Sequence, residues 1–226
     1  MMEENLFPIF FNVNTQRDFF EGGSYKIPSV EHILTNLNDI TQYAKIRGAK
    51  VISTVGWYHP NSKFLSDTPD YNKTYPKHCL MNTEGAKFLK ETSPDSYFLM
   101  DWNSPSGLAF HELHENNNVV VTKKELDFFE GNTYSESLIH NLGIPIMRRP
   151  LFMVYGINIG PVVLGLLRRG YAVKVVEDAN RNFNGMPFKK NDIIEEKQNP
   201  YPDQIVGQLK DETPLQFLTT KEVLSL

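Results

Sequence analysis

The sequence predicts an α/β fold, an open three-layer sandwich in which a mostly parallel sheet is covered by helices on both faces. Short apolar runs alternate with helical patterns along the chain, which is typical of parallel strands joined by right-handed crossover helices. The first run, FPIFFNV at 7–13, is continuously apolar, as expected for a strand that both helical layers bury. With 226 residues, the chain suits one domain that covers 1–226.

The first crossover is predicted directly after that strand. Ser29 follows Pro28 and is expected to cap a helix whose apolar positions keep a helical period until Gly48 ends it. Further strands are expected at 49–55, 96–102, 117–123, 151–156, 172–179 and 214–220, with helices at 134–143, at 161–170 and near Lys221. The polar stretch 180–213, rich in Asn, Pro and Lys, predicts a long surface excursion.

Composition and charge exclude several classes of function. The net charge of −4 argues against a general nucleic-acid-binding protein. Cys79 is the single cysteine and cannot form an intramolecular disulfide, and the acidic start MMEEN lacks the basic region of a signal peptide. The uncharged run 150–167 has the length of a membrane helix, but its prolines and glycines divide it into a strand, a turn and a helix. We therefore expect a cytoplasmic protein without nucleic-acid or membrane partners.

The residues that follow the strands carry a recognisable pattern. In an open parallel sheet, ligands bind outside the carboxyl ends of the strands. The segments expected there include FNVNTQRDFF, GWYHP, PKHCLMNTEGAKF, VVVTKKELDFFEGN and VYGINIGPVV. In chain order, these segments resemble the motifs of the isochorismatase-like superfamily, whose nicotinamidase branch consists of cysteine hydrolases. The resemblance spans nearly the whole chain and implies the same α/β fold.

The resemblance implies a catalytic triad of aspartate, lysine and cysteine, and two of its positions are changed here. The lysine falls on Lys123, with Lys124 as the neighbouring alternative. The aspartate position falls on Asn14, whose amide cannot accept a proton at neutral pH. The cysteine position falls on Val162, which has no nucleophilic atom. We therefore expect a non-catalytic small-molecule binder or partner subunit that has lost the Asp and Cys of the triad.

A rival hypothesis keeps hydrolase activity in a rearranged site. Asp18 lies four residues after Asn14 and could act as the acid beside Lys123 in amide or vinyl-ether hydrolysis. The resemblance implies a structural role for this second aspartate. Cys79 falls where the family carries a cysteine that is not the nucleophile, and a buried cysteine behaves as a small apolar side chain.

The resemblance also implies a divalent metal site built from an aspartate and two histidines. His59 and His78 remain, but Gly56 stands at the aspartate position and Tyr58 is an apparent insertion before the first histidine. Two imidazoles without a carboxylate make a weak zinc site. Structural histidines are therefore favoured and no cofactor is expected, with a divalent metal such as zinc as the alternative.

Ligand binding is expected to involve Phe19, Trp57, Ile157 and Asn158. The resemblance implies that both aromatic rings line the pocket, where they could stack on a flat ring. This predicts a small aromatic or amide-bearing ligand, with burial of both rings in the core as the equal alternative. The resemblance also implies a cis peptide bond, which would fall at Ile157–Asn158, and a loop that positions backbone N–H groups for a ligand.

Two further pairs of charged or titratable residues have no counterpart in the family pattern. His111 and His114 have the spacing of a helical metal pair, but a solvated helix face is the simpler interpretation. Arg148 and Arg149 could contact an anionic ligand or a neighbouring subunit, and exposure to solvent is the default. Because the fold commonly forms oligomers, a homo-oligomer or pairing with a paralogue is expected.

Overall fold

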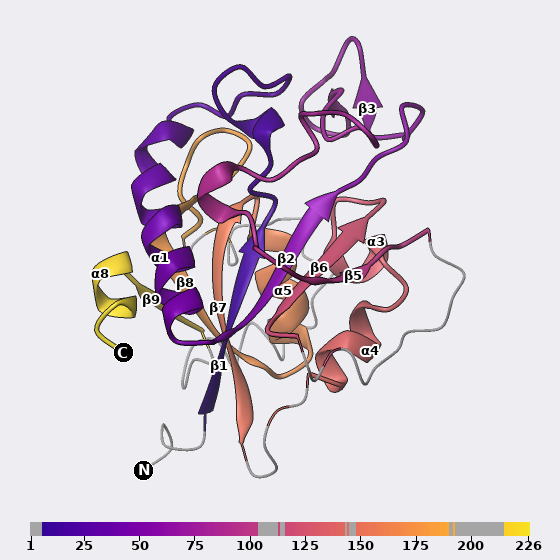
Figure 1. Ribbon diagram of the computed structural model, residues 1–226. Helices are drawn as coiled ribbons and strands as arrows, with labels where there is room; N and C mark the ends of the chain where they lie inside the picture. Colours follow the sequence, from indigo (N-terminus) through magenta and orange to yellow (C-terminus); the bar gives the residue numbers. More distant parts are fainter. Residues whose placement is uncertain are drawn as a thin grey trace.

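A seven-stranded parallel sheet forms the centre of the computed structural model, with the order β5-β6-β2-β1-β7-β8-β9 (Figure 1). The structure describes residues 6–103, 113, 116–142, 144, 148–189, 192 and 215–226. Every neighbouring pair of strands in this sheet is parallel. His111 and His114, and most of the predicted excursion at 180–213, lie outside the described residues.

All of the predicted strands are present, with small changes at their ends. They are β1 (Leu6–Val13), β2 (Lys50–Gly56), β5 (Phe98–Met100), β6 (Asn118–Lys123), β7 (Arg149–Ile157), β8 (Ala172–Arg181) and β9 (Leu215–Leu218). A second sheet pairs β3 (Leu65–Ser66) with β4 (Tyr75–Pro76). Sequence patterns did not predict these two strands, because two residues are too few to establish an alternation.

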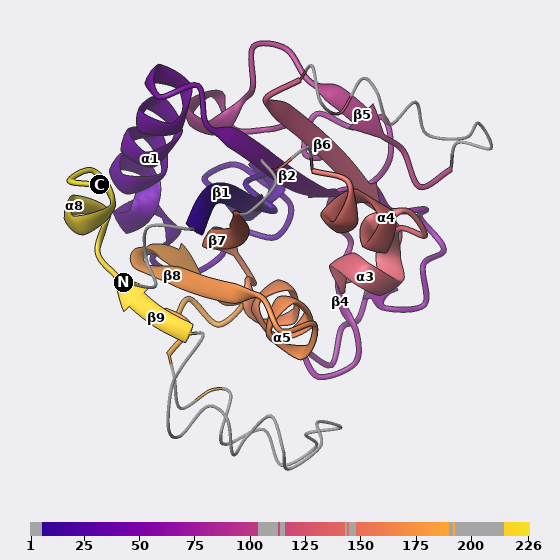
Figure 2. The ribbon, with the colours of Figure 1, turned by 90° about the horizontal axis from the view of Figure 1, so that it is seen from below.

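Helices cover both faces of the main sheet, as the predicted three-layer sandwich requires (Figure 2). One side holds α1 (Leu34–Ile46) and α8 (Thr220–Val223), and the other holds α3 (Phe128–Gly131), α4 (Ser135–His140) and α5 (Gly160–Arg168). Two apolar cores result, one on each side of the sheet. In β1, Ile9 and Phe11 belong to the core under α5, whereas Phe10 belongs to the core under α1. The continuously apolar run at 7–13 is therefore buried on both faces.

The ends of the helices confirm some sequence predictions and correct one. Gly48, with φ of 58°, follows the end of α1 as predicted. Thr219 begins α8 through a capping box with Glu222. Ser29, however, is not a helix cap: it has φ of 56°, its side chain makes no capping bond, and the chain enters α1 through the 3-10 helix η3 (Val30–Ile33).

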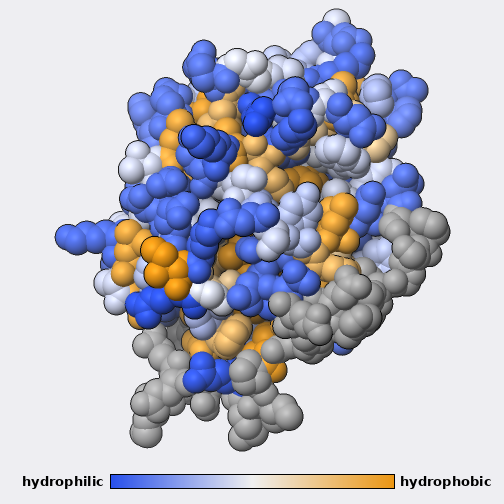
Figure 3. All heavy atoms as spheres, in the orientation of Figure 1, coloured by the Kyte–Doolittle hydropathy of each residue, from blue (hydrophilic) through white to orange (hydrophobic). Residues whose placement is uncertain are grey.

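The uncharged run at 150–167 folds as a strand and a helix. It forms most of β7, the loop after it and most of α5. Among the described helices, none combines the length and the apolar character that crossing a membrane needs. Figure 3 shows a largely polar surface on the face seen in Figure 1, with apolar atoms in several separate places.

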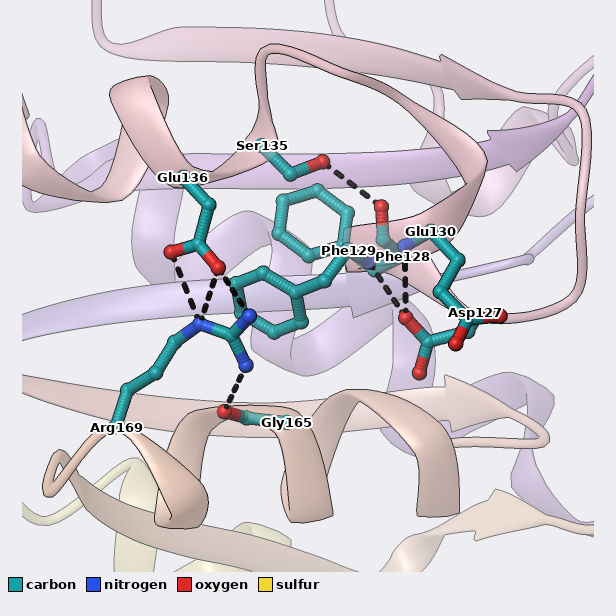
Figure 4. A network of polar contacts seen from close by, with 8 residues as sticks. All are labelled: Asp127, Phe128, Phe129, Glu130, Ser135, Glu136, Gly165 and Arg169. Carbon is teal, nitrogen blue, oxygen red and sulfur yellow. Dashed lines mark hydrogen bonds and ion pairs between the residues drawn. The ribbon is translucent and has the colours of Figure 1, made fainter.

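Arg169, just after α5, joins this helix to α3 and α4 (Figure 4). Its guanidinium carbon lies 3.5 Å from the ring centroid of Phe129, and its Nε donates to both carboxylate oxygens of Glu136 at 2.8 and 2.9 Å. Its Nη1 donates to the carbonyl of Gly165 at 2.8 Å. A Cβ at Gly165 would lie 2.5 Å from the Phe129 ring, so only glycine allows this close packing. The contacts fix α5 and thereby the loop that precedes it.

Candidate functional site at the carboxyl ends of the strands

The carboxyl ends of β1, β2, β6 and β7 meet at the centre of the sheet. β1 pairs with β2 on one side and with β7 on the other, so β2, β5 and β6 extend the sheet in one direction from β1, and β7, β8 and β9 extend it in the other. Such a switch in strand order is where ligands bind in open α/β sheets. Hydrogen bonds at these strand ends join Asn14 to Ile157 and Lys123 to Tyr58, and all four residues are buried.

Lys123, the last residue of β6, is completely buried and uses all of its donors within the protein. Its Nζ donates to the hydroxyl of Tyr58 at 3.2 Å and to the carbonyls of Glu125 and Leu126 at 3.3 and 2.8 Å. Burial lowers the pKa of Lys123 to about 8 from its ordinary value of 10.5. An ammonium group has three N–H donors, so none is left for a ligand.

Tyr58 fills the space above Lys123. Its ring is buried and packs edge-on against Phe64 and His78, with centroid separations of 4.9 and 5.5 Å. A Cβ at Gly56 would lie 2.6 Å from this ring, so the ring occupies the room that the missing side chain leaves. Burial raises the pKa of Tyr58 well above 10, which keeps the phenol neutral. Sequence reasoning noticed the insertion at Tyr58 and the glycine at 56 but missed that one compensates for the other.

Asn14 holds the loop after β7 rather than facing an open space. Its Nδ2 donates to the carbonyl of Ile157 at 3.1 Å, while its Oδ1 is buried without a partner. Asn14 has φ of 51°, a left-handed conformation that asparagine tolerates well. An ionised carboxylate at this position has no N–H or O–H to donate, so it would be repelled by the Ile157 carbonyl oxygen. The amide of Asn14 supplies the donor that this carbonyl accepts.

The loop after β7 differs from what the resemblance implies. No cis peptide bond occurs among the described residues, so the Ile157–Asn158 bond is trans and that expectation is wrong for this chain. The turn is made instead by Asn158, which has φ of 52°. The N–H of Asn158 donates to the carbonyl of Arg181 at 2.7 Å and is therefore not offered to a ligand. Val162 is buried in the core under α5.

An open pocket of about 620 Å³ lies outside this buried centre. Asn158, Gly160 and Pro161 form one wall, and Glu125 and Asp127, from the segment after β6, form another. Three aromatic side chains, Phe64, Tyr75 and Phe188, contribute to the lining. Asn14, Tyr58, Lys123 and Val162 are not among its described lining residues.

Asp18 joins two loops. Its Oδ1 accepts from the N–H of Ser24 at 3.0 Å, and its Oδ2 accepts from the N–H of Cys79 at 2.6 Å. A Cβ at Gly85 would lie 2.0 Å from the carboxylate, so the loop packs directly on it. Cys79 itself is fully buried with φ of 49°, and burial raises the pKa of its thiol well above 9. Both side chains are buried, and the Cys79 thiol is held in its neutral form, so neither is placed as an exposed catalytic group would be.

Asp18→Asn is expected to lower the free energy of unfolding by about 2 kcal/mol, because an amide can replace only one of the two acceptor oxygens and a buried N–H loses its partner. Chemical denaturation measures the change. Asp67→Asn removes an exposed carboxylate that pairs with Lys77, and this control should change stability by less than about 0.5 kcal/mol. Unchanged stability of Asp18→Asn together with lost turnover would instead support a catalytic Asp18.

The two predicted metal histidines have unlike surroundings. His59 is exposed, and its Nδ1 accepts from the N–H of Asn61 at 3.2 Å. His78 is fully buried among aromatic rings, its Nδ1 donates to the carbonyl of Pro76 at 2.6 Å, and its Nε2 has no partner. Burial lowers the pKa of His78 to about 4, so this ring is neutral at physiological pH.

These side chains do not fit a divalent ion. Among the described residues, no group of three or more His, Cys, Asp or Glu side chains is placed to hold a metal. The position of the missing carboxylate, Gly56, is covered by the Tyr58 ring. A zinc-like ion requires several convergent nitrogen, sulfur or oxygen ligands, and His59 and His78 do not supply such a set.

The remaining predicted residues lie around the centre rather than in a shared pocket. Phe19 is buried and stacks on Phe183 at 5.8 Å, which corresponds to the core interpretation. Trp57 is half-buried, and its carbonyl accepts from Trp102 Nε1 at 3.1 Å. The ammonium of Lys124 lies over the Trp102 ring at 5.8 Å, outside the buried centre. Arg148 and Arg149 are exposed, at the amino-terminal end of β7 and far from this site along the strand.

Solved structures of similar architecture cover almost the entire chain. An N-carbamoylsarcosine amidase from Thermoplasma acidophilum superposes with a TM-score of 0.59 at 13% identity, covering 95% of this chain and 96% of that one. An isochorismatase hydrolase from Oleispira antarctica gives 0.59 at 13% identity and covers both chains completely. A zinc-bound pyrazinamidase from Pyrococcus horikoshii gives 0.56 at 19% identity, with 94% and 98% covered. This chain has the isochorismatase-like fold.

Sequence comparison adds one local match. A nicotinamidase/pyrazinamidase from Mycobacterium tuberculosis is 32% identical over 76 residues, which are 34% of this chain. The match spans only about 40% of the length of that curated relative. No family model matches the chain. The superposed structures establish the fold, but at such low sequence identity they do not establish the chemistry. The chemistry must be argued from the residues themselves.

Within the isochorismatase-like fold, the predicted site residues separate into three groups. Asn14 and Ile157 are hydrogen-bonded to each other, and Lys123 is buried against Tyr58 at the end of β6. Phe19, Asp18 and His78 are buried in the core beside it, where each has structural contacts. Asn158 is the predicted residue that lines the open pocket, whereas His59 is exposed to solvent.

Proposed function

We propose that this chain is a non-catalytic protein with the isochorismatase-like fold, which binds a small aromatic or amide-bearing molecule in the open pocket beside the buried centre. One observation carries the proposal: the Lys123 ammonium is enclosed by the Tyr58 hydroxyl and the carbonyls of Glu125 and Leu126. The charge that would stabilise a reacting group is thus already used inside the protein. The role of partner subunit stays a prediction.

The other groups that hydrolysis needs support the same proposal. Amide hydrolysis through a covalent intermediate requires a nucleophile and a base within hydrogen-bond reach of each other. Val162 is buried and apolar, and Asn14 donates its amide to a carbonyl. Asp18, the acid of the rival hypothesis, accepts two backbone N–H groups and contacts a glycine. We therefore favour binding over a rearranged hydrolase.

The open pocket suggests the character of the ligand. Phe64, Tyr75 and Phe188 supply aromatic surface, while Asn158 and Asn182 supply amides that can donate and accept hydrogen bonds. Four carboxylate residues line the pocket against two cationic ones; the acidic residues are Glu125, Asp127, Glu130 and Asp192, and the cationic ones are Lys63 and Arg168. This balance favours a neutral or cationic molecule over an anion.

A turnover assay on the purified chain tests the absence of catalysis. We expect no product from nicotinamide, from isochorismate or from a pool of small amides when each mixture is followed by mass spectrometry. Lys123→Met is assayed beside the unmodified chain, with circular dichroism to verify that the variant folds. Turnover that disappears in the folded variant would reject the proposal in favour of a site built around Lys123.

Thermal-shift screening with small aromatic amides tests the binding half of the proposal. A ligand that raises the melting temperature of the unmodified chain should lose its effect in Pro161→Trp, because the indole would occupy the pocket. Thr35→Trp adds the same side chain at an exposed position of α1 and should keep the shift. A shift that survives Pro161→Trp would show that the ligand binds elsewhere.

A further inference from the structure

A second pocket lies at the opposite end of the sheet from the candidate site. It has a volume of about 550 Å³, which falls in the range of small-molecule sites. The amino-terminal ends of β1, β7 and β8 form its floor, and the end of α1 forms a wall. Its apolar lining includes Leu6, Phe7, Phe10, Leu151, Met153 and Leu226. This pocket lies at the amino-terminal ends of the strands, whereas the buried centre and the open pocket lie at their carboxyl ends. It shares no residue with either of them.

The charged side chains of this pocket all have one sign. Arg47, Arg148 and Lys174 line it, and none of the described lining residues is acidic. Arg47 and Arg148 are exposed. The guanidinium of Arg47 lies 5.1 Å from the ring centroid of Tyr43, a cation–π contact that orients it beside the apolar lining. In a chain with a net charge of −4, this is a local reversal of charge around an apolar hollow.

Large apolar side chains are also exposed beside the pocket. Leu226, which lines it, is 60% exposed, and Ile46, the neighbour of Arg47, is 83% exposed. Single exposed apolar residues are common, but a group around an apolar hollow marks a surface that contacts an apolar ligand.

We propose that this pocket binds an amphiphilic anion, a molecule with an extended apolar body and a single carboxylate, as in a medium-chain fatty acid. The apolar floor would take the hydrocarbon body, and the guanidinium groups of Arg47 and Arg148 would pair with the carboxylate at the rim. The hollow shape and the limited volume favour a small molecule over a protein surface, which is usually flatter and larger.

Calorimetric titration of the full chain with three probes that share a ten-carbon tail tests the proposal. Decanoate is expected to bind at one saturable site, at least tenfold more tightly than decanol or decyltrimethylammonium. In the double variant Arg47→Gln/Arg148→Gln, the affinity for decanoate should fall about tenfold, while the affinity for decanol should be unchanged. The control Lys73→Gln/Lys90→Gln removes two exposed charges elsewhere and should leave decanoate binding intact.

A second variant separates the pocket from the rest of the surface. Ala49→Phe places a ring in the apolar lining and should weaken the binding of both decanoate and decanol. Pro161→Trp, which blocks the pocket of the proposed function, should leave decanoate binding unchanged, so failure of one proposal does not imply failure of the other. Equal affinity for the three probes, or none, would overturn the inference. So would concentration-dependent dimerisation that Arg47→Gln/Arg148→Gln abolishes, because a second copy would then be the occupant.

Discussion

Tyr58→Ala is expected to lower the free energy of unfolding by about 3–5 kcal/mol, the range for removing a large buried aromatic side chain. Two effects combine. Removal of the ring leaves a cavity between Phe64 and His78, and the buried Lys123 ammonium loses one of its three acceptors. Urea denaturation at pH 7 measures the change. A loss of less than about 1 kcal/mol would contradict the view that this ring fills the centre of the fold.

Two companion variants separate the ring from its hydroxyl. Tyr58→Phe keeps the ring and removes only the acceptor of Lys123, so its cost should be about 1–3 kcal/mol. Tyr71→Ala removes a tyrosine that is 62% exposed and should change stability by less than about 0.5 kcal/mol. Added phenol should raise the melting temperature of Tyr58→Ala but not that of the unmodified chain, since only the variant has an empty site of that shape.

Lys123→Met is expected to change how stability depends on pH. Burial holds the pKa of Lys123 at about 8 in the folded chain, against 10.5 in the unfolded chain. Between these values the unfolded state binds more protons, so the stability of the unmodified chain rises with pH. At about 1.4 kcal/mol per pH unit, the gain amounts to about 3 kcal/mol. Below pH 8 the whole penalty of the buried ammonium is present, and above pH 10.5 it is absent.

The measurement is a pair of urea denaturation series from pH 7 to pH 10.5. The difference in unfolding free energy between the unmodified chain and Lys123→Met should move by about 3 kcal/mol in favour of the unmodified chain as the pH rises. The raised pKa of the Cys79 thiol acts in the opposite direction, but it acts on both proteins and largely cancels in the difference. Lys90→Met, at an exposed position, should show no such trend. A flat difference for Lys123→Met would mean that its ammonium is hydrated.

The fold could be predicted closely because hydrophobic patterning is a local property. Strands such as 7–13 and 172–179 are marked by apolar runs, and Gly48 marks the end of the first helix. The placement of Asn14, Lys123 and Ile157 at the same edge of the sheet was also predictable, since parallel strands bring their carboxyl ends to one edge. Ser29 was predicted wrongly, because a capping residue type does not guarantee the backbone conformation of a cap.

The open parallel sheet, its helical layers and the residue types at the centre can all be predicted from the chain alone: an amide at 14, a lysine at 123 and a valine at 162. What these side chains do depends on the folded surroundings of each one. A buried charge must find acceptors wherever the fold supplies them, and for Lys123 they are the Tyr58 hydroxyl and two carbonyls. The spacing of residues in the sequence does not predict that Tyr58 folds back over Gly56. That contact depends on the volume that the surrounding side chains leave unfilled.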